Sequence, residues 1–88
     1  ITPRVMNFFT HNRVNVVTSG NHIWRHSEIN AYLDAHDDLL RPANFPPGCP
    51  GKGFTTFTVG AHTIGVINLQ GRIFMREFVD CPFRAAEA

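Results

Sequence analysis

The fold is decided by the stretch Val16-Val17-Thr18-Ser19-Gly20-Asn21-His22-Ile23-Trp24. An apolar run stops there at a Gly-Asn-His triplet, and a helix-like pattern follows it. Open α/β sheets present their reactive side chains in this way, at the carboxyl ends of buried strands. The stretch therefore predicts an α/β fold with a functional site where this strand ends.

Composition and charge narrow the class of protein. The chain has 88 residues, of which 43% are hydrophobic, and so has room for at most one globular domain. Its eight basic and seven acidic residues are scattered and leave a net charge of +1, which predicts no basic patch for duplex nucleic acid. No run approaches the roughly 18 to 20 apolar residues that cross a bilayer. Cys49 and Cys81 lie in separate Pro-flanked loops, which favours free thiols. We therefore expect a cytoplasmic protein without a membrane partner.

The first elements follow from caps and apolar spacing. Thr2 and Pro3 are typical of a helix start, and the apolar spacing predicts a helix over residues 3–11. Asn12 is expected to end this helix in the left-handed conformation. The β-branched run over residues 14–18 predicts a strand buried on both faces of a parallel sheet. A second helix is expected from a cap at Ser27 to about His36.

The rest of the chain reads as loops around a hairpin. Residues 37–40 are expected to lead into a loop at 41–53, which holds four prolines and three glycines and excludes regular structure. Residues 54–59 and 62–69 predict two strands joined by Gly60-Ala61, which is a type II′ hairpin signal. A further loop with apolar anchors follows, and residues 85–88 are expected to begin a helix.

The Gly20-Asn21-His22 triplet suits phosphate chemistry at a metal. The amide oxygen of Asn21 can ligate a hard divalent cation without adding charge. His22 can donate a proton to a leaving oxygen or stabilise developing charge. The opposing interpretation is a turn after a strand, since most such Asn turns bind no metal.

A wider set of motifs supports the phosphate interpretation. Val-Thr-Ser-Gly-Asn-His-Ile-Trp resembles the Gly-Asn-His block of calcineurin-like metallophosphoesterases. The longer series resembles one bacterial branch of them, the YmdB-like phosphodiesterases, which act on cyclic nucleotides and on 2′,3′-cyclic phosphates. That series comprises residues 18–24, Arg-Pro-Ala-Asn-Phe-Pro at 41–46, Gly-Lys-Gly at 51–53, Val-Ile-Asn-Leu-Gln-Gly-Arg at 66–72 and Cys-Pro-Phe at 81–83.

The resemblance implies a four-layered α/β/β/α sandwich around two divalent metal ions, iron or manganese. Asn21 matches the family's asparagine metal ligand, and His22 matches the histidine that contacts the phosphate and protonates the leaving group. Asn44 matches a loop position that borders the site and is a candidate for substrate binding. The substrate would be a small cyclic nucleotide, with a 2′,3′- or 3′,5′-cyclic phosphate. Homo-oligomerisation stays open.

The family's other ligands are absent from these residues. Its Asp-rich motif would precede Ile1, and its Gly-x-His-x-His motifs would follow Ala88. We therefore expect residues 1–88 to be a partial metallophosphoesterase domain that is inactive alone. Two alternatives remain: a non-catalytic α/β binding or scaffold domain in which Asn21 and His22 only cap the following helix, and a nucleotidase-type phosphoesterase.

Overall fold

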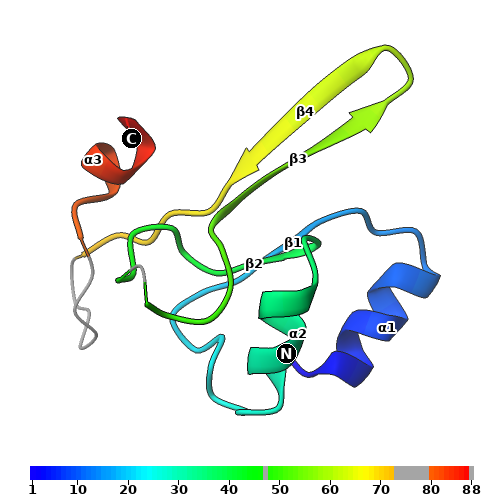
Figure 1. Cartoon of the computed structure of the whole chain (residues 1–88), viewed down its shortest axis with the longest axis horizontal. Coiled ribbons are helices and arrows are strands. Elements are labelled where there is room, and N and C mark those ends of the chain that lie inside the picture. Colours follow the sequence, from blue (N-terminus) through cyan, green and yellow to red (C-terminus); the bar gives the residue numbers. More distant parts are fainter. Residues whose placement is uncertain (47, 73–79, 88) are drawn as a thin grey trace.

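A computed structural model describes residues 1–46, 48–72 and 80–87 (Figure 1). Within them the order of elements is α1, β1, α2, β2, β3, β4 and α3, and the strands form two small two-stranded sheets. The fold is thus mixed α/β, as predicted. The four-layered sandwich stays a prediction.

Helix α1 (Pro3–His11) begins as expected. Thr2 is its N-cap, and the Thr2 hydroxyl oxygen accepts a hydrogen bond from the Val5 backbone N–H at 3.3 Å. The predicted left-handed Asn12 is wrong, since Asn12 has φ −92° and Arg13 instead has φ +64°. Asn12 closes the helix with its side chain, which donates to the Phe8 carbonyl oxygen at 2.8 Å, and the chain reverses one residue later.

Strand β1 (Val17–Thr18) is shorter than the predicted strand over residues 14–18. It pairs in parallel with β2 (Leu39–Leu40), which was expected to be the entry to a loop. Two-residue strands carry no periodic pattern, so β2 gives no local signal of its own. The expected burial on both faces is also wrong within this chain, because Val17 is half-buried and Thr18 is exposed.

Helix α2 (Ile29–Ala35) crosses from β1 to β2, as parallel strands require. It ends at the expected place, with His36 as its C-cap. The predicted cap at Ser27 is wrong: Glu28 occupies the N-cap position, and its side chain makes no capping hydrogen bond.

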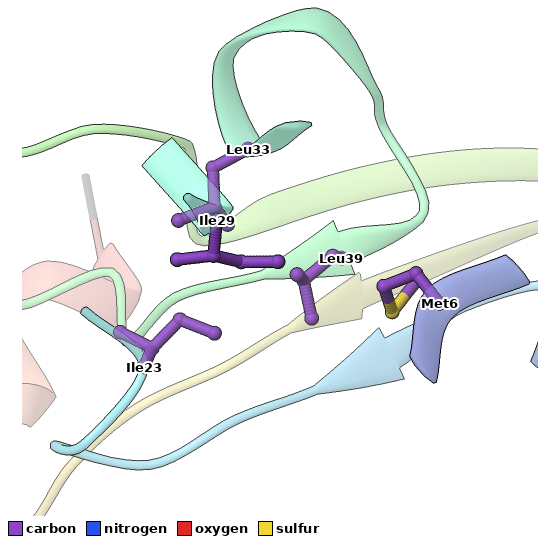
Figure 2. Close-up of a cluster of buried hydrophobic side chains, with 5 residues drawn as sticks. All are labelled: Met6, Ile23, Ile29, Leu33 and Leu39. Atoms are coloured by element: carbon purple, nitrogen blue, oxygen red, sulfur yellow. The ribbon is translucent and has the colours of Figure 1, made fainter. Parts of the chain in front are cut away.

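The apolar core lies between α1, α2 and β2. Figure 2 shows its five buried side chains, which come from α1, the turn after β1, α2 and β2: Met6, Ile23, Ile29, Leu33 and Leu39. Ile29 and Leu33 lie four residues apart on α2 and so face the same side. Each such side chain contributes about 1.5 to 3 kcal/mol on burial. The burial of Ile23, at 3% exposure, fixes the residue directly after His22.

Strands β3 (Phe54–Val59) and β4 (His62–Ile67) form the predicted antiparallel hairpin, with Phe54 opposite Ile67, and β4 ends two residues before the predicted end at residue 69. Gly60 has φ +60° and Ala61 does not have a positive φ, which fits the predicted type II′ turn. The hairpin extends away from α1 and α2 (Figure 1).

The predicted irregular loop before the hairpin is confirmed for its described residues, which form no helix or strand. The chain returns on itself there. The backbone N–H of Arg41 donates to the Lys52 carbonyl oxygen at 3.0 Å, that of Ala43 to Asn68 at 2.7 Å, and that of Asn68 to Gly53 at 2.8 Å. Residues 41–43, 52–53 and 68 therefore run side by side.

Helix α3 (Pro82–Glu87) begins before the predicted start at residue 85, with a proline in its first turn. Two parts of the prediction lie outside the described residues: residues 73–79 of the expected loop with apolar anchors, and Ala88, the last residue of the expected helix. None of the described helices is both long and apolar enough to cross a bilayer.

Candidate functional site

The Gly-Asn-His turn (residues 20–22) leaves the carboxyl end of β1. The Ile23 backbone N–H donates to the Gly20 carbonyl oxygen at 3.3 Å, and that of Arg25 donates to His22 at 3.0 Å. Asn21 is half-buried and His22 is exposed. Because Ile23 is packed in the core, the far end of the turn is fixed while the side chain of His22 stays open to solvent.

Asn21 and His22 share one surface hollow of about 390 Å³. Its walls are Ile1 and the continuous run of residues 18–23. The structure thus brings together the two residues that the sequence proposed for catalysis and metal binding. Neither caps α2, whose N-cap is Glu28, so the premise of the scaffold alternative is wrong.

Two side chains hold the near end of the turn. The Ser19 hydroxyl donates to the Leu40 carbonyl oxygen at 2.6 Å. The Asn68 side-chain amide donates to the carbonyl oxygens of Ser19 at 2.6 Å and of Leu40 at 3.2 Å. The ends of β1, β2 and β4 are therefore tied together directly before the Gly-Asn-His turn.

Asn44 does not line this hollow. It is 1% exposed, and its amide nitrogen donates to the carbonyl oxygens of Gln70 at 2.7 Å and Asp80 at 2.8 Å. Its amide oxygen accepts from the Gln70 backbone N–H at 2.9 Å. Asn44 therefore clamps the Gln70 backbone from both sides, and substrate binding by Asn44 stays a prediction.

Gln70 lies against the Gly-Asn-His turn. A Cβ atom placed on Gly20 would meet the Gln70 amide oxygen at 4.0 Å. Asn68 and Gln70 belong to one of the motifs that carry the family resemblance, yet sequence reasoning assigned no role to either of them. Their position in the sequence could have indicated them. Both residues follow the apolar run of β4, just as Asn21 follows the apolar run of β1.

A second hollow of about 490 Å³ lies beyond Gln70. Its walls are Gln70, Gly71, Arg72, Cys81, Pro82 and Phe83. Hydrogen bonds from the backbone at Arg84 and then Phe83 lower the pKa of the Cys81 thiol. Cys81 and Cys49 are both free thiols, as expected.

The fit of a metal can be tested against the side chains present. The amide oxygen of Asn21 is a ligand type that hard divalent ions accept. No three His, Cys, Asp or Glu side chains of the described residues come together to hold a metal ion. These residues therefore supply one candidate ligand and do not build a metal centre by themselves.

Known proteins resemble the chain over its whole length. The family model described as YmdB-like protein matches residues 1–88. A 2′,3′-cyclic-nucleotide 2′-phosphodiesterase of Bacillus subtilis (strain 168) is 39% identical over 87 residues, which cover 99% of this chain and 33% of that protein. The crystal structure of a hypothetical protein from Thermus thermophilus is also 39% identical, with a TM-score of 0.90 over 99% of this chain and 34% of that one. The chain thus spans about a third of the length of these relatives.

Proposed function

The chain belongs to the YmdB-like protein family, and from this membership we propose that the protein carrying it is a phosphodiesterase that opens cyclic nucleotides. The observation that carries the proposal is the 39% identity to a 2′,3′-cyclic-nucleotide 2′-phosphodiesterase, which extends over 99% of this chain. The hollow that holds Asn21 and His22 supports it, since it offers a proton donor at an accessible surface. A 2′,3′-cyclic phosphate is the first substrate to test, and a 3′,5′-cyclic phosphate the second.

In the proposed reaction His22 is the general acid. A water oxygen bonds to phosphorus, the bond between phosphorus and O2′ breaks, and O2′ takes a proton from the His22 imidazolium, which becomes neutral imidazole. His22 regains the proton that the attacking water releases to solvent, so one water molecule is consumed for each bond broken. The exposed position of His22 suits this exchange, because the ring must meet both substrate and solvent.

Two divalent metal ions, iron or manganese, belong to the same proposal, with Asn21 as one of their ligands. Such ions would supply Lewis-acid stabilisation of charge on the phosphoryl oxygens. The half-buried position of Asn21 beside His22 in one hollow supports its part in this arrangement. The described elements would form part of a four-layered α/β/β/α sandwich. Asn44 would contribute to substrate binding indirectly, by holding the backbone of Gln70 in place.

The test uses the enzyme expressed from its full reading frame and 2′,3′-cyclic AMP as substrate. His22→Ala should lower kcat by at least about 100-fold, since general acid catalysis contributes about 10² to 10⁴-fold, while the bound metal content stays unchanged. Asn21→Ala should lower the metal content measured by elemental analysis. His26→Ala is the matched control, because His26 is exposed and does not line the hollow.

Three results would contradict parts of the proposal. Equal turnover by His22→Ala and the unaltered enzyme would remove His22 from the chemistry. Unchanged metal content in Asn21→Ala would remove Asn21 from the ligand set. Release of inorganic phosphate from a 5′-nucleotide, without opening of the cyclic substrate, would favour a nucleotidase.

A further inference from the structure

Asn68 follows β4 directly and joins four separate segments through its backbone and side chain. Its backbone N–H donates to the Gly53 carbonyl oxygen at 2.8 Å, and its carbonyl oxygen accepts from the Ala43 N–H at 2.7 Å. Its side-chain amide donates to Ser19 at 2.6 Å and to Leu40 at 3.2 Å. Asn68 thus sits where the carboxyl ends of β1 and β2 meet the end of β4.

The orientation of the Asn68 amide is fixed by its partners. Ser19 and Leu40 both present carbonyl oxygens, which can only accept hydrogen bonds. The amide nitrogen of Asn68 must therefore face them, and it donates both of its hydrogens to them. An aspartate in its place has the same shape but no donor. It would also bring a negative charge against two carbonyl oxygens.

We propose that Asn68 is a positioning residue for the Gly-Asn-His turn. Ser19 is the last residue before this turn, and its carbonyl oxygen receives the shorter of the two amide hydrogen bonds. At the other end of the turn the Ile23 side chain is buried at 3% exposure. The turn is therefore held at both ends, by a polar contact before it and an apolar contact after it.

Loss of the Asn68 contact should leave the apolar anchor in place and release the polar one. Ser19 would keep its own hydroxyl bond to Leu40, so the strand end would remain near β2 while the Ser19 carbonyl loses its partner. Groups that hold the ligands of a metal site in place by hydrogen bonds typically change metal affinity or activity by about 10- to 100-fold when they are lost, and we take the same range for Asn68, which holds the residue two positions before Asn21. The consequence for turnover rests on the proposed phosphodiesterase function, whereas the consequence for the turn does not.

The first measurement follows the turn itself by amide hydrogen exchange in the full-length protein. In Asn68→Asp the Ile23 and Arg25 amides, which donate to Gly20 and His22, should exchange at least about tenfold faster, while exchange of the Met6 amide, which donates to Thr2 in α1, is unchanged. Asn12→Asp is the matched control. It removes the same kind of amide-to-carbonyl bond, of 2.8 Å to Phe8, at the exposed end of α1.

The second measurement follows turnover of 2′,3′-cyclic AMP. Asn68→Asp should lower kcat by about 10- to 100-fold and change KM much less, because the contact orients a reacting group. In the His22→Ala background the same change should lower kcat by less than about threefold, since a residue that acts through His22 has little left to orient. A purely structural role would give equal losses in both backgrounds.

The outcomes separate the two proposals. If the unaltered enzyme opens no cyclic nucleotide, the proposed function falls, and the exchange rates of Ile23 and Arg25 still decide the positioning role. If the enzyme is active but these exchange rates do not change in Asn68→Asp, or the kcat losses are equal with and without His22, the positioning role is overturned. Should Asn68→Asp fail to fold, Asn68→Ala gives the same readouts without the added charge.

Discussion

Gly53 offers the sharpest test of how the loop and the hairpin meet. A Cβ atom built on Gly53 would lie 2.3 Å from the Ala43 Cα, 2.4 Å from its Cβ and 2.6 Å from its backbone nitrogen. Ordinary carbon–carbon contacts lie at about 3.5 to 4.0 Å, so Gly53→Ala demands a displacement of more than about 1 Å. The obstructing atoms are mostly backbone, which cannot rotate out of the way.

The cost follows from the hydrogen bonds beside this contact. Moving Ala43 away from Gly53 strains the bonds from Ala43 to Asn68 at 2.7 Å and from Asn68 to Gly53 at 2.8 Å. Overpacking alone costs about 1 to 3 kcal/mol, and each backbone hydrogen bond that is lost adds about 1 kcal/mol. We expect Gly53→Ala to lower the free energy of unfolding by about 3 to 5 kcal/mol.

Urea denaturation of the full-length protein measures this loss. The matched control is Gly48→Ala, because a Cβ on Gly48 meets nothing within 4 Å. That substitution should leave stability unchanged or raise it slightly, since alanine restricts the unfolded chain. Equal midpoints for Gly53→Ala and Gly48→Ala would refute the packing argument.

Two further predictions concern titratable groups. Burial, and then the hydrogen bond from the Tyr32 hydroxyl to Asp38, raise the pKa of Tyr32 above 10.0. The protonated hydroxyl therefore contributes its full stability below pH 10, and this contribution is lost as the pH rises through the raised pKa. Tyr32→Phe should therefore lower the free energy of unfolding by about 1 kcal/mol at pH 7, and the difference between the two proteins should narrow above pH 10. Urea denaturation at several pH values measures this difference. A difference that stays constant with pH would argue against the linkage. Backbone hydrogen bonds at Arg84 and Phe83 lower the pKa of Cys81, so iodoacetamide should alkylate Cys81 faster at pH 7 than it alkylates the cysteine of an unstructured peptide. Mass spectrometry follows both reactions. A slower reaction at Cys81 would count against a lowered pKa.

Elements with local signals were predictable from the sequence. The cap at Thr2 and the Gly60-Ala61 turn indicated α1 and the hairpin, because each signal lies within the element that it starts or closes. Strand β2 was missed because its two residues are defined by pairing with β1 across α2, and nothing within Leu39-Leu40 marks that partner. Ser27 was a plausible cap by residue type, but the helix starts beyond it.

The residues of the candidate site also differ in how readily the sequence indicates them. Asn21 and His22 were candidates because they interrupt an apolar run, and the structure puts both in one hollow, while their roles in catalysis and metal binding stay predictions. Asn68 was missed because its role depends on carbonyl oxygens of Ser19 and Leu40, and any residue can present a backbone carbonyl. Residue type and spacing identify candidate reactive groups more readily than side chains whose partners are backbone carbonyl oxygens.

The contact between Asn68 and Ser19 also sets an order of events during synthesis. The two residues are 49 positions apart, so the polar anchor of the Gly-Asn-His turn is the closure of a long loop. A ribosome makes Ser19 first, at about 5 to 20 residues per second, and several seconds pass before Asn68 exists to bind it. During that interval the nascent chain carries Asn21 and His22 without the contact that orders them. Completion of β4 is thus the step at which this part of the site can take its final shape.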